Sequence, residues 1–258
     1  MEYGLIGEKL SHSFSKPIHE KLANYTYEIT PLTHTEFHEF MDKKEFKAIN
    51  VTIPYKCDVI PYLHEMDERA KSIGAVNTIV NRCGKLYGYN TDFFGFLYMI
   101  QHNHVDIEGK KVLVLGNGGA AKAVFAVLDY LKAREVYVVK YKSEANVLTY
   151  EEAAKLHADA DVIVNTSPIG MYPNVNDSPI DLSPYHNLSA VLDLIYNPLT
   201  TCFMNQARKR SIKAVNGLEM LVAQAKYAVE YFLDKNIDDS VIDPIYNDIL
   251  DLMKNETK

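Results

Sequence analysis

The sequence predicts an α/β protein of two domains, and two observations carry this prediction. Over the first ninety residues, apolar strand-like runs alternate with stretches of helical apolar spacing. Further on, residues 109–140 ("GKKVLVLGNGGAAKAVFAVLDYLKAREVYVVK") have the pattern of a buried strand, a glycine-rich turn, a helix and a second buried strand. Such a unit implies a parallel sheet with a right-handed crossover. A chain of 258 residues is long enough for two ordinary domains.

The elements expected before residue 104 follow from apolar spacing and cap residues. Strands are expected at 2–6, 25–30, 48–53 and 76–81, the last leading through "RCGKLYG" into another short strand. Helices are expected at 15–24, 34–42, 57–72 and 91–103, the last with Thr91 or Asp92 as its cap.

The second part of the chain contains the βαβ unit and three further strand patterns. Strands are expected at 112–115, 136–139, 161–167, 190–196 and 213–217, and helices at 120–132, 200–210, from 218 onward and at 243–254. We therefore expect an α/β substrate domain formed by 1–95 plus 218–258, and a doubly wound, Rossmann-like nucleotide-binding domain formed by 96–217.

Composition and charge exclude several classes of protein. The net charge of −7, without a basic stripe, argues against nucleic-acid binding. Three widely spaced cysteines without a CxxC pair predict neither disulfides nor a metal site, and favour a reducing cytoplasm. No run approaches the roughly 18 apolar residues of a membrane span. Because the chain starts with the strand-like "YGLIG" at residues 3–7, we expect no signal peptide and no membrane partner. A monomer and a homodimer remain equally open.

The glycine turn indicates a dinucleotide. Gly116 and Gly118, followed by Ala121, lie between a strand and a helix, which is the context that gives this weak pattern its meaning. Gly116 suits the tight turn, Gly118 lets a pyrophosphate approach the backbone, and Ala121 permits close packing of helix and strand. The helix N-terminus then offers free N–H groups to the phosphates. The alternative is a glycine-rich turn that binds nothing.

The end of the second strand of this unit bears on the choice of dinucleotide. A carboxylate there would hold the ribose 2′-hydroxyl of NAD. Instead the strand runs into Lys140-Tyr141-Lys142, with no acid before Glu144. Two cations suit a 2′-phosphate, so the sequence favours NADP.

At this point the sequence resembles the shikimate dehydrogenase family, over nearly its whole length. Eight motifs occur in the family's order: "SHSFS" (11–15), "NVTIPYK" (50–56), "GAVNT" (74–78), "GYNTD" (88–92), "GNGGAAKAV" (116–124), "NTSPIGM" (165–171), "DLIYNP" (193–198) and "NGLEMLVAQA" (216–225). Each motif alone is unremarkable, and the series of eight is highly specific.

The resemblance implies NADPH-dependent reduction of 3-dehydroshikimate to shikimate, in a cleft between the two domains. It assigns catalysis to Lys56 and Asp92. The substrate-binding residues that it implies are Ser13, Ser15, Asn50, Thr52, Asn77, Tyr196 and Gln224. The cofactor-binding residues are Gly116, Asn117, Gly118, Gly119, Ala120, Ala121, Lys140, Lys142, Thr166 and Gly217.

The chemistry suits these residue types. A ketone that accepts hydride becomes an alkoxide and needs a proton within hydrogen-bond reach. Lys56 stands just beyond a strand that Pro54 is expected to end, and Asp92 is expected to pair with it and share its proton. Taken singly, Lys56 also fits a solvated lysine, while Asp92 and Ser15 also fit helix caps. The joint pattern favours the catalytic interpretation.

The sequence departs from the family pattern after the second strand of the nucleotide domain. Tyr141 replaces the arginine that the family uses on the 2′-phosphate, and only residues 141–146 separate Lys140 from the next apolar run. A parallel crossover normally needs a dozen or more residues, so the usual helix is expected to be missing here. Two alternatives follow: a quinate/shikimate dehydrogenase that uses NAD, and a nucleotide-binding homologue with weak or lost catalysis.

Overall fold

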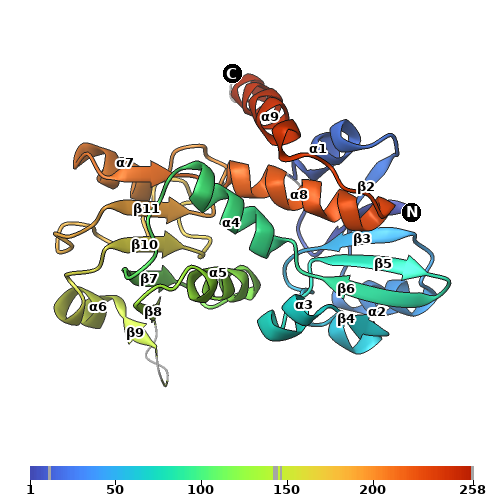
Figure 1. Cartoon of the computed structure of the whole chain (residues 1–258), viewed down its shortest axis with the longest axis horizontal. Coiled ribbons are helices and arrows are strands. Elements are labelled where there is room, and N and C mark those ends of the chain that lie inside the picture. Colours follow the sequence, from blue (N-terminus) through green and yellow to red (C-terminus); the bar gives the residue numbers. More distant parts are fainter. Residues whose placement is uncertain (11–12, 142–144, 146, 257–258) are drawn as a thin grey trace. The chain divides into compact units, whose positions relative to one another are not determined.

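The computed structural model describes residues 1–10, 13–141, 145 and 147–256, and the chain forms two compact units (Figure 1). Residues 1–96 and 221–258 make up the first unit, and residues 97–220 make up the second. The first unit is therefore discontinuous in sequence. Helices α4 (Asp92–His102) and α8 (Leu218–Leu233) carry the chain across the two boundaries.

The first unit is built on a mixed six-stranded sheet with the order β2-β1-β3-β5-β6-β4. Its strands are β1 (Tyr3–Gly7), β2 (Tyr27–Pro31), β3 (Ala48–Val51), β4 (Glu65–Met66), β5 (Thr78–Arg82) and β6 (Lys85–Tyr89). Strand β1 pairs in parallel with β2 and β3, and β5 is antiparallel to both β3 and β6. The carboxyl ends of β1, β2 and β3 consequently share one edge of the sheet.

Helices cover this sheet because its strands alternate between two apolar faces. Ile6 and Ile49 pack with Phe37 and Met41 of α2, while Leu5 and Ala48 pack with Ala228 and Phe232 of α8. The helical elements of the unit, besides α4 and α8, are α1 (Ser15–Leu22), α2 (His34–Lys43), η1 (Ile60–Tyr62), α3 (Glu68–Ile73), η2 (Asp239–Val241) and α9 (Ile242–Glu256).

The single helix expected at 57–72 is wrong. The structure has the short η1, strand β4 and helix α3 over this stretch. Pro61 lacks the N–H that a continuing helix needs, and the N–H of His64 instead bonds the Leu86 carbonyl of β6 at 2.8 Å. Asp67 then starts α3 as a new N-cap by accepting from the Ala70 N–H at 2.8 Å.

The second unit is a parallel six-stranded sheet with the order β12-β11-β10-β7-β8-β9. Its strands are β7 (Lys111–Leu115), β8 (Glu135–Lys140), β9 (Leu148–Thr149), β10 (Val162–Asn165), β11 (Ala190–Asp193) and β12 (Lys213–Val215). Helices α5 (Gly119–Tyr130), α6 (Tyr150–Leu156) and α7 (Cys202–Lys209) connect them. Leu113, Ile163 and Val191 pack with Ala153 of α6 and Phe203 of α7.

The connection from β8 to β9 is short, and its described residues form no helix, as the sequence predicts. Strand β9 pairs in parallel with β8 only at Val139–Leu148 and Lys140–Thr149, and none of the described residues of 141–147 is helical. Because β9 joins only the end of β8, the chain has a short distance to return and needs no crossover helix. The pair β9 and α6 itself escaped the sequence analysis.

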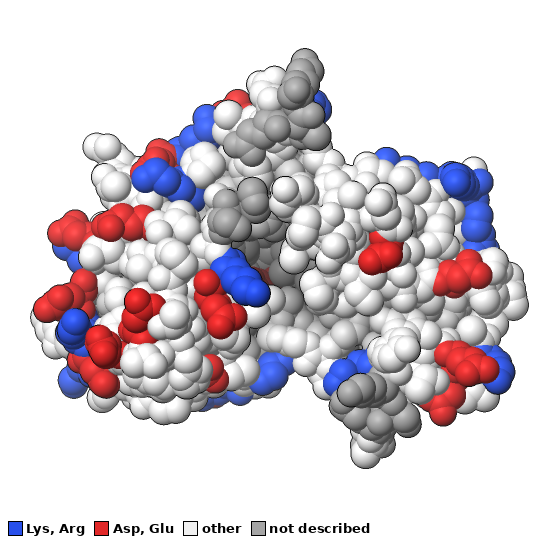
Figure 2. Space-filling model, turned by 180° about the vertical axis from the view of Figure 1, so that it is seen from behind, with Lys and Arg blue, Asp and Glu red and all other residues white. Residues whose placement is uncertain are grey.

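Charge is mixed on the surface seen in Figure 2, where acidic and basic side chains are interspersed. Among the residues that the structure describes, no helix is both long and apolar enough to cross a membrane. Within the same residues, no group of three or more histidine, cysteine or carboxylate side chains is placed to hold a metal ion.

Candidate active site

The centre of the candidate site is an ion pair between Lys56 and Asp92. Strand β3 ends at Val51, two residues before the expected end, and Lys56 lies in the turn that follows. Asp92 is the first residue of α4. The Lys56 Nζ donates to the Asp92 Oδ2 at 2.5 Å, and the two side chains are only 11% and 8% exposed. A buried ion pair is costly to desolvate and is weak evidence for stability, so this pair is a candidate for a chemical role.

A buried amide fixes the other oxygen of the carboxylate. Asn77 donates from Nδ2 to Asp92 Oδ1 at 3.0 Å and to Thr91 Oγ1 at 3.0 Å. Its Oδ1 accepts from the Thr91 N–H at 2.7 Å. The Gln224 Oε1, on α8, lies at 3.4 Å from Asn77 Nδ2. Each oxygen of Asp92 therefore has a donor from a different segment, and rotation of the carboxylate is restricted.

The network continues from Asn77 into the sheet. Asn50 of β3 donates from Nδ2 to the Asn77 carbonyl and to Thr78 Oγ1, both at 3.1 Å. The Thr78 hydroxyl contacts Asn77 Oδ1 at 3.0 Å. Tyr27 of β2 donates from its hydroxyl to Asn50 Oδ1 at 2.7 Å. The four residues of this part of the network are all buried: Tyr27, Asn50, Asn77 and Thr78. Because buried polar groups need hydrogen-bond partners, each of these side chains depends on the bonds that the others provide.

The side chains of Thr91 and Asp92, one of which was expected to cap α4, both contact Asn77. The Oδ1 of Asn90 lies 3.4 Å from the Phe93 N–H in the first turn of α4. Ser15 is not the cap of α1, because it is the first residue of that helix and Phe14 occupies the cap position. The Ser13 hydroxyl accepts from the Ser15 N–H at 3.2 Å.

Three predicted substrate-binding residues of the first unit stand outside the network. Ser13 and Ser15 lie at the N-terminus of α1, and their described hydrogen bonds do not reach Asn77 or Asp92. Thr52 lies just beyond β3, where its backbone N–H donates to the Ile6 carbonyl at 2.9 Å. Its methyl group packs so closely on Gly7 that a Cβ added there would come within 2.6 Å. All three residues belong to the first unit.

The glycine turn of the second unit fits a dinucleotide phosphate. Gly116 has φ +107°, and an added Cβ would lie 2.8 Å from the Oγ1 of Thr166, which itself donates to the Leu115 carbonyl at 2.8 Å. Gly118 is the cap of the twelve-residue α5, and an added Cβ there would meet no atom within 4 Å. A glycine in open space beside free helix N–H groups leaves room for an anion. Ala121 is fully buried, as its packing role requires.

The neighbouring cofactor positions are only partly described. Asn117, Gly119 and Ala120 belong to the turn and the start of α5. Lys140 ends β8, and the Tyr141 side chain is 87% exposed. Lys142 lies outside the described residues.

Tyr196 and Gly217 also belong to the second unit. An added Cβ at Gly217 would lie 2.1 Å from the Leu194 carbonyl oxygen, so only glycine fits there. The Gly217 N–H donates to the Ile195 carbonyl at 3.0 Å, which ties it to the segment that carries Tyr196. Burial raises the pKa of Tyr196.

Sequence analysis missed Asp193, although it lies in the "DLIYNP" motif. This fully buried carboxylate, at the end of β11, accepts from Thr201 Oγ1 at 2.6 Å and from Asn165 Nδ2 at 3.0 Å. Burial raises the pKa of Asp193 to about 6, against the opposing effect of the bonds from Thr201, the Ile195 N–H and Asn165. The available signal was a carboxylate inside an otherwise apolar strand pattern, in the same motif as Tyr196.

The structure thus brings together Lys56, Asp92, Asn50, Asn77 and Gln224 within the first unit, and the turn, Thr166, Tyr196 and Gly217 belong to the second. A parallel sheet with this glycine turn, in a chain that also buries a lysine–carboxylate pair, is typical of dinucleotide-dependent oxidoreductases.

Comparison with known proteins gives the particular family. Residues 5–79 match the family model of the shikimate dehydrogenase substrate-binding domain. A shikimate dehydrogenase (NADP⁺) of Clostridium beijerinckii is 38% identical, and the match covers 99% of both chains. The chain belongs to the shikimate dehydrogenase family.

Solved structures agree. A chorismate mutase/shikimate 5-dehydrogenase fusion protein from Clostridium acetobutylicum is similar with a TM-score of 0.91 and 38% identity, over 98% of each chain. A shikimate 5-dehydrogenase from Thermus thermophilus, solved in complex with NADP(H) and shikimate, is similar with a TM-score of 0.84 and 26% identity, over 96% of this chain and 98% of that one.

Proposed function

We propose that the protein catalyses the reversible, NADPH-dependent reduction of 3-dehydroshikimate to shikimate in the cytoplasm. The observation that carries the proposal is the buried Lys56–Asp92 pair, held at 2.5 Å inside a satisfied polar network. Family membership supports it, since the Clostridium beijerinckii relative is a shikimate dehydrogenase (NADP⁺) and the Thermus thermophilus enzyme was solved in complex with NADP(H) and shikimate. The three cysteines are free thiols, which supports a reducing compartment.

We assign substrate binding and proton transfer to the first unit and cofactor binding to the second. When bound, the reduced nicotinamide supplies a hydride to the substrate carbonyl. Lys56 then gives a proton to the oxygen on which charge develops, and Asp92 holds the ammonium while it does so. Asn77 keeps Asp92 facing Lys56 through the bond to Oδ1. Asn50, Thr52, Gln224 and Tyr196 are proposed to bind the ring, and Ser13 and Ser15 its carboxylate.

We assign the pyrophosphate of NADP to the turn formed by Gly116, Asn117, Gly118, Gly119 and Ala120, where Gly118 leaves open space. Thr166, which lies beside Gly116, is also assigned to the cofactor, Gly217 is assigned to the nicotinamide end, and Lys140 and Lys142 are assigned to the 2′-phosphate. We propose a monomer or a homodimer.

A spectrophotometric assay of shikimate oxidation tests the proposal. Wild-type protein should oxidise shikimate with NADP⁺, and Lys56→Ala should reduce kcat by about 10²- to 10⁴-fold with a smaller effect on shikimate binding. Lys71→Ala is the matched control, since Lys71 pairs with Glu68 at 2.7 Å on the exposed face of α3. Normal turnover by Lys56→Ala would refute the role given to this lysine.

The second candidate is a dehydrogenase that uses NAD, which the exposed Tyr141 favours. A shikimate 5-dehydrogenase from Listeria monocytogenes, with 26% identity, was solved in complex with shikimate and NAD. The same assay with NAD⁺ and with quinate separates the candidates through kcat/KM. Binding of NADPH without turnover of either substrate would instead indicate a nucleotide-binding homologue.

A further inference from the structure

Tyr27 stands at the start of the polar network, and sequence analysis gave it no role. Its side chain is fully buried, and its hydroxyl donates to Asn50 Oδ1 at 2.7 Å. An asparagine amide can be turned by half a rotation, which exchanges its oxygen and nitrogen. The Asn77 carbonyl can only accept, so it requires the Nδ2 of Asn50 on its side, and the Tyr27 hydroxyl gives the opposite Oδ1 the donor that holds the amide in this orientation. In that orientation the Nδ2 of Asn50 faces the Asn77 carbonyl and Thr78 Oγ1.

Helix α1 holds Tyr27 by its ring and by its backbone. The ring of His19 stacks on the Tyr27 ring with centroids 3.9 Å apart and planes within 15°. On the same helix, Lys16 donates to the Tyr27 carbonyl at 3.0 Å and Glu20 accepts from the Tyr27 N–H at 3.0 Å. Positions 16, 19 and 20 share one helix face, so a single face clamps one residue.

The charge state of this cluster is fixed over the neutral range. Burial raises the pKa of Tyr27 well above 10, so that its hydroxyl remains a donor. Burial also lowers the pKa of His19 to about 3, so that the stacked imidazole is neutral. The His19 Nδ1 is hydrogen-bonded to the Tyr25 hydroxyl at 2.8 Å.

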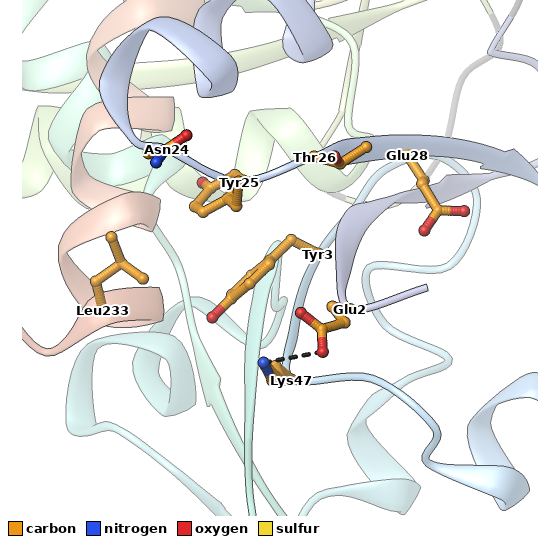
Figure 3. A pocket seen from close by; sticks show the side chains of 8 residues that line it. All are labelled: Glu2, Tyr3, Asn24, Tyr25, Thr26, Glu28, Lys47 and Leu233. Carbon is orange, nitrogen blue, oxygen red and sulfur yellow. Dashed lines mark ion pairs between the residues drawn. The ribbon is translucent and has the colours of Figure 1, made fainter.

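Tyr25 adjoins this cluster through its hydrogen bond to His19. Together with Tyr3, whose ring lies 4.3 Å from its own, it borders a surface cavity of about 530 Å³ that Glu2, Glu28 and Lys47 also line (Figure 3). Tyr25 is half-buried, whereas Tyr27 is fully buried against Asn50. Both tyrosines contact His19, and loss of the hydroxyl is the same chemical change in each, but of the two hydroxyls only that of Tyr27 bonds Asn50.

We propose that Tyr27 is a positioning residue for the Lys56–Asp92 pair, acting through the hydrogen bonds of Asn50 and Asn77. The proposal rests on the proposed function, since it concerns the same pair. Four successive contacts connect the two ends: Tyr27 to Asn50, Asn50 to the Asn77 carbonyl, Asn77 Nδ2 to Asp92, and Asp92 to Lys56. This series of hydrogen bonds begins at Tyr27 of β2, which α1 holds in place, and ends at Asp92, which orients the amine of Lys56.

The test compares Tyr27→Phe with Tyr25→Phe in the full-length protein. Each variant removes one hydroxyl, from a side-chain hydrogen bond of 2.7 Å and of 2.8 Å respectively. Tyr27→Phe should lower kcat for shikimate oxidation about tenfold and leave KM within about twofold, because substrate contacts persist while the pair is misaligned. Tyr25→Phe should leave both within about twofold. Circular dichroism melts establish that both variants fold.

A second readout does not depend on activity. The side-chain amide of Asn50, assigned through its absence in Asn50→Asp, should shift and exchange faster with water in Tyr27→Phe than in Tyr25→Phe by ¹H–¹⁵N NMR. If wild-type protein fails to oxidise shikimate, the proposed function is wrong, and this spectrum still decides whether Tyr27 orients Asn50. An unchanged Asn50 amide, an unchanged kcat in folded Tyr27→Phe, or an equal loss in Tyr25→Phe would each overturn the proposal.

Discussion

The side chain of Asn77 donates to the Oδ1 of Asp92 at 3.0 Å, on the oxygen that the ammonium of Lys56 does not contact. One carboxylate is thus held by a neutral amide and by a cation at the same time. The amide of Asn77 restricts rotation of the Asp92 carboxylate, so that Oδ2 stays directed at the ammonium of Lys56. Geometry of this kind, rather than the mere presence of the pair, is what proton transfer requires.

Lys56 and Asp92 should behave as one functional unit. Asp92→Asn should lower kcat by about 10²- to 10⁴-fold, as Lys56→Ala does, and the double variant should lose little more, because removing either partner already disables the unit. Steady-state kinetics of the three variants at one pH measures this. Glu68→Gln, which breaks the exposed Lys71 pair, serves as the control and should retain full activity. Losses that multiply in the double variant would mean that the two residues act independently.

Asn77 should matter for both stability and activity. Asn77→Ala leaves the Thr91 N–H and one oxygen of Asp92 without their buried partner, and we expect a loss of about 2–3 kcal/mol in the free energy of unfolding. Urea denaturation measures this loss. Asn81→Ala is the matched control, because Asn81 bonds the backbone of Lys44, Phe46 and Gly84 at the far end of β5. Asn81→Ala should destabilise the protein while leaving kcat near the wild-type value, whereas Asn77→Ala should lower kcat as well. Equal losses of kcat in the two variants would contradict the role given to Asn77.

The glycine turn offers a test of cofactor binding that is separate from folding. At Gly118, with φ −83° and open space around an added Cβ, alanine should fold normally and weaken NADP⁺ binding by about tenfold or more. At Gly217, alanine would collide with the Leu194 carbonyl and should lower the melting temperature instead. Calorimetric titration with NADP⁺ and thermal melts distinguish the two effects. Unchanged NADP⁺ affinity in folded Gly118→Ala would place the pyrophosphate elsewhere.

Asp193 should make the protein less stable at neutral pH than at mildly acidic pH. Burial raises its pKa to about 6 in the fold, from an ordinary value of 3.8, so the folded state binds this proton more tightly than the unfolded chain does. As pH rises from about 4 to about 6, the contribution of Asp193 to the free energy of unfolding should therefore fall by about 3 kcal/mol, and then level off.

The measurement is the difference in unfolding free energy between Asp193→Asn and wild type, at pH 4 and at pH 7. The unfolding free energy of Asp193→Asn should increase relative to that of wild type as pH rises from 4 to 7. Asp181→Asn is the control with the opposite sign, because hydrogen bonds from Ser183 lower the pKa of that carboxyl. A difference for Asp193→Asn that does not change with pH would show that the carboxyl titrates normally.

Local patterns were sufficient for most of the fold. Buried strands such as β7 and amphipathic helices such as α2 follow from apolar spacing, because burial of one face is a property of the segment itself. The interval 57–72 was mispredicted because its apolar spacing is compatible with a helix, while the pairing of Glu65 and Met66 with β6 is a distant contact. Pro61 was the signal that should have divided it.

The contact between Lys56 and Asp92 was predictable only because of the resemblance, since a lysine and an aspartate 36 positions apart have no local sequence pattern that indicates contact. Tyr27 shows the limit more clearly. It lies in no quoted motif, and its importance comes from a hydroxyl that meets Asn50 across β1, the strand that separates β2 from β3. Such a contact depends on sheet order, which spacing along one strand does not encode.

The core of the first unit contains residues from both the N-terminal and the C-terminal part of the sequence, and this affects the order in which the protein can fold during synthesis. Leu5, Ala48 and Val80 obtain Ala228 and Phe232 as core neighbours only when α8 arrives. During translation the ribosome must first release all of the second unit, which is continuous and can fold meanwhile. Until then one face of the early sheet stays bare, and Asn77 lacks Gln224. The nascent chain therefore exposes this apolar face for most of its synthesis, and the polar network around Asn77 is completed only when α8 has been made.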